Sequence, residues 1–177
     1  MGDLSGYLLS RSQGDLLPWA EQVAAAETYG LTVGQIEEAA LQAGLLPSRY
    51  QRNRKTLSTA DQLTLFRSTV IVIGCGGLGG YIIEELARLG VGRLKAVDPD
   101  VFEEHNLNRQ LMSTVAALGQ PKAQVASARV SQINPAVQIT ALREHFSKEN
   151  GRSLLDGSDV AVDALDSITT RLELAEA

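Results

Sequence analysis

Apolar residues between positions 69 and 177 form short runs that alternate with longer stretches of helical periodicity. The pattern predicts strands at 70–73, 93–97, 137–142 and 159–164, and helices at 78–89, 121–133 and 167–177. The first run is apolar throughout, which is typical of a strand buried on both faces of a parallel sheet. The alternation predicts an α/β fold, a Rossmann-like doubly wound sheet that is mostly parallel and has right-handed crossovers. Since only about four strands are visible, we expect an incomplete sheet.

Residues 1–46 carry a different pattern, which predicts a helical hairpin. Apolar residues at helical spacing predict a helix over 15–29, and Gly30 ends it. Residues 32–35 have the form of a capping box and begin a second helix, which Gly44 ends. We interpret this N-terminal extension as a packing or dimerisation appendage. Residues 47–68 follow as a basic arm and a short helix, and residues 69–177 as the nucleotide-binding domain.

Composition narrows the class of protein. A length of 177 residues suggests one domain with a small appendage, and a hydrophobic content of 44% allows a core. The net charge of −5 argues against a general binder of nucleic acid or membrane surfaces. No apolar run approaches the roughly 20 residues of a membrane span, and the start Met1–Asp3 lacks the features of a signal peptide. The single cysteine excludes an internal disulfide and a cysteine-based zinc site within this chain, which fits a cytoplasmic setting.

The glycine-rich turn after the first strand is the clearest functional signal. Gly74, Gly76 and Gly79 follow the pattern G-x-G-x-x-G between a predicted strand and a predicted helix. Glycines there allow a tight turn and let backbone N–H groups approach a phosphate at the helix N-terminus. Asp98 ends the next strand, where an acidic residue binds ribose hydroxyls, and Asp100 is a weaker candidate for that role. The pattern predicts a nucleotide site.

Four polar residues have no use in a plain nicotinamide site: Asn106, Arg109, Gln110 and Lys122. Group transfer at a triphosphate needs positive charge against the phosphates, because charge develops there in the transition state. Arginine offers a forked donor and lysine a point charge, while an amide can hold a phosphate oxygen or orient the arginine. These residues therefore favour an enzyme that handles a triphosphate.

Asp166 follows the last predicted strand, where a carboxylate can hold Mg²⁺ beside a phosphate. We expect the nearby Asp163 to be structural and to bond the local backbone. Cys75 lies inside the glycine loop, and we interpret it as a small buried side chain rather than a nucleophile. His105 and His145 show no partner pattern that would indicate a triad or a metal site.

Six ordered segments together resemble a known family: 49–53, the glycine loop, 97–100, 106–110, 119–122 and 163–166. Residues 49–177 resemble the nucleotide-binding part of the ThiF/MoeB/HesA adenylyltransferases, relatives of the ubiquitin-activating enzymes. The resemblance implies an enzyme that binds ATP and Mg²⁺. It also implies transfer of AMP to the C-terminal glycine carboxylate of a ubiquitin-like sulfur-carrier protein, with release of pyrophosphate.

The resemblance also implies roles for single residues. Asp98 would bind ribose, Gly77 would lie against the nucleotide, and Asp166 would hold the metal. The phosphates would be surrounded by Asn106, Arg109, Gln110 and Lys122. Arg52 would reach into the site of the partner subunit, so the active form would be a homodimer. Because the acceptor carboxylate is already ionised at neutral pH, positioning and electrostatics suffice and no general base is needed.

This sequence departs from the family pattern in two places. Ser167 stands where the family usually has Asn, and the sequence ends 11 residues after Asp166. We therefore expect the C-terminal part of the family fold, its zinc motifs and most of its carrier-docking surface to be missing here. Two alternatives stay open: a truncated, non-catalytic module for ATP binding or dimerisation, and an NAD-dependent oxidoreductase. The acceptor is open too, since related enzymes act on peptides or tRNA, although the acidic net charge disfavours tRNA.

Overall fold

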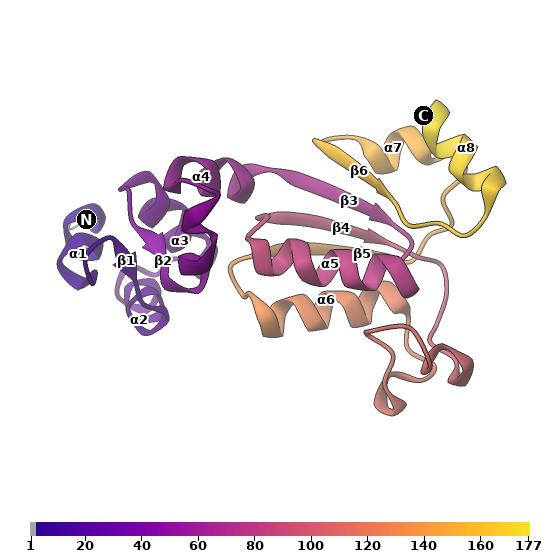
Figure 1. The fold of residues 1–177 in the computed structure, drawn as a ribbon, viewed down its shortest axis with the longest axis horizontal. Coiled ribbons are helices and arrows are strands. Elements are labelled where there is room, and N and C mark those ends of the chain that lie inside the picture. The colour runs from indigo at the N-terminus through magenta and orange to yellow at the C-terminus, as the bar shows by residue number, and fades with distance from the viewer. Residues whose placement is uncertain (1–2) are drawn as a thin grey trace.

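A four-stranded parallel sheet forms the centre of the protein (Figure 1). The computed structural model describes residues 3–177; Met1 and Gly2, part of the start in which we expect no signal peptide, lie outside them. The sheet has the order β5-β4-β3-β6, with β3 (Thr69–Ile73), β4 (Arg93–Val97), β5 (Gln138–Leu142) and β6 (Val160–Asp163). The strand order reverses between β3 and β6, as at the switch point of a doubly wound fold. The predicted Rossmann-like α/β class is confirmed.

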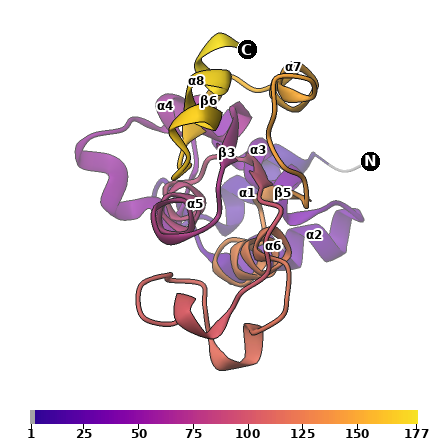
Figure 2. The same cartoon turned by 90° about the vertical axis from the view of Figure 1, so that its right-hand side faces the viewer.

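Both faces of the sheet are covered by helices: α5 (Gly77–Leu89), α6 (Lys122–Ile133), α7 (Gly151–Leu155) and α8 (Ile168–Glu176). Because side chains alternate along a strand, Val70 and Val72 of β3 pack on the face that holds α5 and α6. Ile71 and Ile73 point to the other face, against Phe146 and residues of α7 and α8. Figure 2 shows α5 and α6 on one side of the strands and α7 and α8 on the other. Helix α7 is not among the helices that the sequence pattern predicts.

Glu84 of α5 joins the two helices of the first face. Its carboxylate accepts hydrogen bonds from Arg129 of α6, at 2.9 Å, and from Arg88, one turn further along α5. These bonds and charges, that of Arg129 first, hold the pKa of Glu84 below its ordinary value. A carboxylate with a lowered pKa stabilises the fold above the ordinary glutamate pKa and loses that contribution as the pH falls through the lowered value.

The variant Glu84→Gln is therefore expected to unfold more easily at neutral pH, by about 1 kcal/mol, because both arginines are half exposed to solvent. The difference should shrink once the pH falls below the ordinary glutamate value of 4.5. Denaturant unfolding at pH 7 and pH 3.5 would measure it, with Glu85→Gln on the exposed side of α5 as the control. An equal deficit at both pH values would contradict an electrostatic origin.

The N-terminal extension contains three helices and a short parallel pair of strands: α1 (Leu4–Arg11), β1 (Leu16–Leu17), α2 (Trp19–Tyr29), α3 (Val33–Gln42) and β2 (Leu46–Pro47). The predicted start of the first helix at Asp15 was wrong, because Leu16 and Leu17 pair with β2 and the helix begins only after Pro18. The capping box at the start of α3 is confirmed. A basic arm, the 3₁₀ helix Ser48–Lys55, and α4 (Thr59–Arg67) lead into β3. The domain boundaries at residues 46 and 68 stay a prediction.

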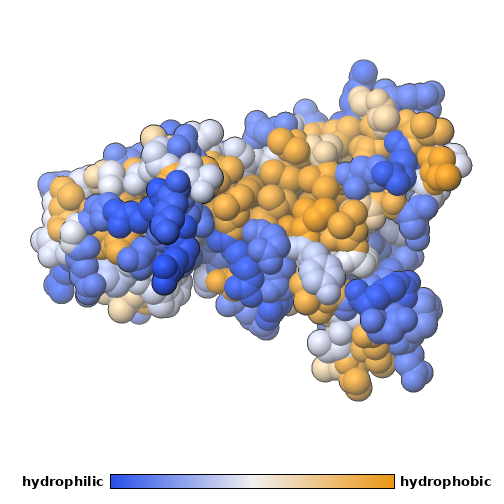
Figure 3. Space-filling model, viewed as in Figure 1, coloured by the Kyte–Doolittle hydropathy of each residue, from blue (hydrophilic) through white to orange (hydrophobic). Residues whose placement is uncertain are grey.

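Strand β6 is an edge strand, since it pairs only with β3 within residues 3–177. Figure 3, which has the same viewpoint as Figure 1, shows apolar surface between the extension and α8. Apolar side chains exposed on α5, β6 and α8 include Leu78, Tyr81, Val160, Ile168 and Leu172. None of the helices in the described chain is both long and apolar enough to cross a membrane.

Candidate nucleotide site

A cavity of about 460 Å³ opens at the carboxyl ends of β3, β4 and β6, beside the switch point of the sheet. Ligands of doubly wound folds bind at such points, because the loops on either side separate there. Nine of the residues predicted from the sequence line it: Gly74, Gly76, Gly77, Asp98, Asp100, Arg109, Gln110, Lys122 and Asp166. The fold thus brings together residues that are up to 92 positions apart in the chain.

The glycine loop leaves the start of α5 free for a ligand. The N-cap of α5 is Gly76, which has no side chain to cap the helix. Within the described residues, the N–H groups of Gly76, Gly77 and Leu78 donate to no backbone or side-chain acceptor. Unpaired N–H groups and the positive end of the helix dipole attract an anion. The geometry suits a phosphate group.

Two glycines of the loop are required by packing. Gly74 has φ of +99°, and a Cβ there would lie 2.6 Å from the carbonyl oxygen of Ala164. A Cβ on Gly79 would lie 1.8 Å from the carbonyl oxygen of Gly74, which is closer than any non-bonded contact allows. Gly79, predicted from the sequence to bind the nucleotide, is absent from the lining of the cavity; it lets the start of the helix pack against the loop. A Cβ on Gly77, by contrast, would meet no atom within 4 Å.

Asp98 is buried and acts on the loop as well as on the cavity. One carboxylate oxygen accepts the N–H of Cys75 at 2.7 Å, and the other accepts the N–H of Asp100 at 2.9 Å. Each carboxylate oxygen can accept a further bond, so Asp98 can serve a ligand hydroxyl while it fixes the glycine loop. The sequence pattern predicted the binding of a ligand hydroxyl but not the contact with the glycine loop.

Lys122 is a buried cation in the wall of the cavity, with 7% of its surface exposed. Its ammonium lies 3.0 Å from the Asp100 carboxylate, which is itself largely exposed, and its backbone N–H donates to the Asp100 carbonyl. A cation in the first turn of a helix is unfavourable to the dipole, and Asp100 offsets that cost. Asp100 is therefore the ion-pair partner of the lysine, a role that the sequence did not reveal.

The remaining phosphate candidates differ in how freely they face the cavity. Arg109 is exposed, and its guanidinium donates to the carbonyl of His105 at 3.0 Å. Gln110 is buried, and its Oε1 has no hydrogen-bond partner among the described residues. Asn106 does not line this cavity; its amide oxygen caps the turn at Glu103 and it lines a smaller neighbouring cavity of about 340 Å³. An orienting role fits Asn106 better than a direct contact.

Asp163 and Asp166 have different surroundings in the structure. The Asp163 carboxylate accepts the N–H of Leu165 at 3.0 Å and pairs with Arg171 at 2.7 Å, so its structural role is confirmed. Asp166 is exposed at the cavity, with no ion pair or side-chain hydrogen bond to the rest of the described chain. Within residues 3–177, no three His, Cys, Asp or Glu side chains gather where they could hold a metal ion. Magnesium bound by one or two carboxylates and by phosphate oxygens would still suit Asp166.

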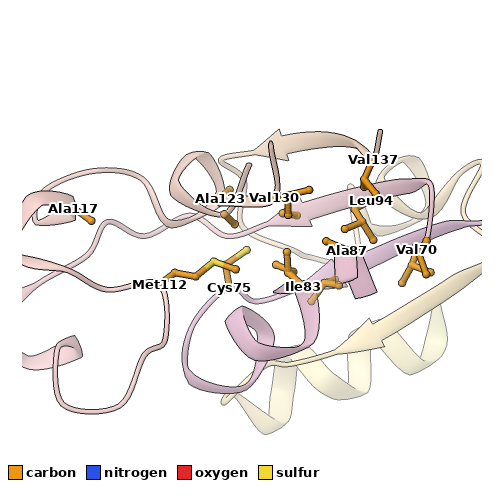
Figure 4. Close-up of a cluster of buried hydrophobic side chains, with 14 of the residues drawn as sticks. Val70, Cys75, Ile83, Ala87, Leu94, Met112, Ala117, Ala123, Val130 and Val137 are labelled. Atoms are coloured by element: carbon orange, nitrogen blue, oxygen red, sulfur yellow. The ribbon is translucent and has the colours of Figure 1, made fainter. Parts of the chain in front are cut away.

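Cys75 points away from the cavity into the core, near Met112 (Figure 4). It is 1% exposed, and burial raises the pKa of its thiol, with a further contribution from the charge of Asp98. A thiol in this state is a poor nucleophile, so the interpretation of Cys75 as a small buried side chain is confirmed.

The sequence did not indicate that the segment after β5 forms part of the cavity wall. Glu144, His145 and Phe146 line the cavity. Their only signal was position, because they follow a parallel strand whose carboxyl end lies at the same edge of the sheet as the cavity. Arg52 lies elsewhere: it is exposed in the basic arm, and it is absent from the lining of this chain's cavity.

The variant Asp100→Asn is expected to bind inorganic tripolyphosphate about fivefold more tightly in metal-free buffer. It removes one negative charge from beside the anion and releases Lys122 from its carboxylate partner, a change worth about 1 kcal/mol at a hydrated site. Calorimetry in the presence of EDTA would measure it, with Glu85→Gln as a control of equal charge change. Weaker binding would mean that Asp100 contacts the ligand itself, as the sequence pattern suggested.

Comparison with known proteins defines the class. The model of the ThiF family matches residues 50–177, and the chain belongs to this family. It is 44% identical over 125 residues to the SAMP-activating enzyme E1 of Haloferax volcanii, covering 70% of this chain and 46% of that protein. It is 40% identical over 110 residues to the sulfur carrier protein adenylyltransferase of Thermus thermophilus, covering 62% and 41%.

A solved structure extends the comparison to the fold. The tRNA N6-threonylcarbamoyladenosine dehydratase TcdA of Escherichia coli, in complex with ATP, matches with a TM-score of 0.69 and 27% identity. The match covers 72% of this chain and 53% of that protein. The chain spans about half the length of the relatives it matches.

Proposed function

We propose that this chain is the nucleotide-binding portion of an ATP-dependent adenylyltransferase that activates the C-terminal glycine carboxylate of a ubiquitin-like sulfur-carrier protein. One observation carries the proposal: the free N–H groups of α5 share a cavity with the cations Arg109 and Lys122 and the acids Asp98 and Asp166. A dinucleotide site needs the loop and one acid, whereas a triphosphate needs the added positive charge.

The reaction follows from these groups without a general base. An oxygen of the acceptor carboxylate attacks the α-phosphorus of ATP, the bond to the bridging oxygen breaks, and pyrophosphate leaves with its electron pair. Lys122 and Arg109 would stabilise the charge that develops on the phosphates. Asp98 would bind the ribose hydroxyls, and Gly77 and Gln110 would lie along the nucleotide. Because no proton changes place in this step, the inert state of Cys75 is no obstacle.

Magnesium would be held by Asp166. Its carboxylate faces the cavity and is not engaged by other described side chains, which leaves it free to share an ion with phosphate oxygens. The ion would neutralise phosphate charge, while Lys122 and Arg109 of this chain bind and orient the nucleotide. Ser167, where the family usually has Asn, accepts the N–H of Thr170 and caps α8.

The acceptor and the assembly are inferred from relatives. Two of them carry names that refer to SAMP or to a sulfur carrier protein, whereas the solved relative with ATP is a tRNA-modifying dehydratase. The net charge of −5 disfavours a polyanionic acceptor, so a carrier protein is the better candidate. We further propose a homodimer in which Arg52 reaches the site of the other subunit.

Pyrophosphate exchange into ATP, with and without a carrier ending in glycine, would test the proposal. Carrier-dependent exchange that Arg109→Ala removes is the expected result. Calorimetry with Mg²⁺–ATP should show binding that is weakened in Arg109→Ala and Asp98→Ala. ATP binding without exchange would favour a non-catalytic module. Exchange stimulated by tRNA would replace the carrier as acceptor, and tighter binding of NADH than of ATP would support an oxidoreductase.

A further inference from the structure

The basic arm Ser48–Lys55 is a 3₁₀ helix of eight residues. Runs of this helix longer than three or four residues are uncommon, because its hydrogen bonds have poorer geometry than those of an α-helix. The arm therefore depends on contacts with other elements for its order. Those contacts come from both the N-terminal extension and the sheet domain.

The first end of the arm is anchored by the extension through Arg49. Its guanidinium pairs with the fully buried Glu37 of α3 and donates to Oε1 of Gln22 in α2 at 3.0 Å. It also lies 4.9 Å from the centroid of the Trp19 ring, within range of a cation–π contact. Three residues of the extension thus hold one arginine.

The same buried carboxylate links the arm to the sheet domain. Tyr50 donates its hydroxyl proton to the second oxygen of Glu37 at 2.7 Å. Asn134, just after α6, donates to the Tyr50 hydroxyl at 2.7 Å and accepts from Arg49 at 2.8 Å. Because every member of this buried network has a partner, it favours one arrangement of the arm.

The other end of the arm is anchored by an ion pair between Arg54 of the arm and Asp15 of the extension. Two of the four basic residues of the arm are therefore engaged by carboxylates of the extension. The other two, Arg52 and Lys55, are exposed and form no ion pair or side-chain hydrogen bond within the described chain. They are three positions apart, and such residues share a face in a 3₁₀ helix.

This pair of cations cannot serve the cavity of its own chain. Asn53, between Arg52 and Arg54, donates to the carbonyl of Leu89 at the C-terminal end of α5. The cavity lies at the other end of this helix, whose 13 residues span about 20 Å. Figure 1 shows the extension and α4 beyond one end of the strands, with the carboxyl ends of β3 and β4 at the far side. An arginine side chain is shorter than this separation.

We propose that the N-terminal extension is a positioning element for the basic arm: through Asp15 and Glu37 it binds Arg54 and Arg49 internally, and it leaves Arg52 and Lys55 exposed for the ligand of a second copy. The second copy, the reach of Arg52 into its site and the identity of the anion all rest on the proposed function. Residues of the extension act here as positioning residues: they select which cations of the arm are bound internally and which are left for the ligand. The extension would then affect turnover without touching the nucleotide.

Hydrogen exchange of the arm amides tests the ordering step without any reaction. Asp15→Asn and Glu37→Gln are expected to raise the exchange of residues 48–57 at least threefold. The matched control is Glu38→Gln, which removes the neighbouring pair of Glu38 with Arg67 of α4 and touches no residue of the arm. Arm exchange that stays unchanged in both variants would overturn the proposal, and Asp15→Asn decides it if Glu37→Gln fails to fold.

A double-mutant cycle tests the positioning step, because a residue that acts through Arg52 has no effect once Arg52 is gone. In pyrophosphate exchange, Asp15→Asn is expected to lower kcat severalfold in the native background and less than twofold in Arg52→Ala. Equal losses in both backgrounds would mean a general structural role and overturn the proposal. If the unaltered chain shows no exchange, the proposed function fails, and hydrogen exchange still decides whether the extension orders the arm.

Discussion

Lys122→Met is expected to lower the rate of pyrophosphate exchange by about two to four orders of magnitude. Lys122 is the most buried cation of the cavity, and a charge that is largely removed from water interacts strongly with a phosphate beside it. Methionine keeps the unbranched apolar stem of the side chain and removes only the ammonium group. The partner Asp100 is largely exposed, so the loss of its ion pair leaves it hydrated and the fold intact.

A loss confined to kcat would show that Lys122 acts on the transition state, while a change confined to KM would indicate uniform binding. Lys95→Met is the matched control: its ammonium donates to the carbonyls of Leu154 and Asp156, and it does not line the cavity. Rates within threefold of the unaltered chain in Lys122→Met, at equal thermal stability, would contradict the role of Lys122 as the phosphate cation.

Gly79→Ala is expected to abolish nucleotide binding and to reduce the free energy of unfolding by about 3 kcal/mol. The added Cβ would lie 1.8 Å from the backbone oxygen of Gly74 and 3.2 Å from the Cβ of Ala164. No flexible side chain can yield at the first contact, so the loop between β3 and α5 must move. That movement would separate Cys75 from Asp98 and disorder the N–H groups that face the phosphate.

Gly77→Ala distinguishes a steric clash within the protein from a steric clash with the bound nucleotide. A Cβ at Gly77 meets no protein atom within 4 Å, and alanine is a better helix former than glycine at this first position of α5. The variant should keep its stability and bind ATP more weakly, because the methyl group would enter the space proposed for the nucleotide. Thermal unfolding and calorimetry on both variants would measure the contrast. Equal stability of Gly79→Ala and the unaltered chain would refute the packing argument.

Local patterns were sufficient for the sheet and for the elements around the glycine loop. The apolar run at 70–73 and the glycine spacing each depend on neighbours within about six positions, so a single sequence carries the whole signal. Asp98 and Asp166 could be assigned to one site from the sequence, because the carboxyl ends of parallel strands meet at one edge of the sheet. Lys122, at the start of a helix, joined them through the positive charge that a triphosphate needs. Their roles toward ATP stay predictions, although the cavity contains all three.

The same reasoning failed where a distant segment decided the local structure. Leu16 and Leu17 fit a helical pattern as well as a strand, and only pairing with residues 46 and 47 made them β1. Helix α1 and helix α7 are too short to give a strong periodic signal.

The sequence by itself determined the fold class, the glycine loop and the set of charged residues at the carboxyl edge of the sheet, because these follow from periodicity and from the parallel topology it dictates. Tertiary structure alone decided how those charges are paired. It placed Asp100 on Lys122, and it brought Arg49 to Asn134, 85 positions away. Hydrogen bonds and ion pairs act over a few ångströms, so pairing depends on the final packing of side chains, which no local pattern encodes.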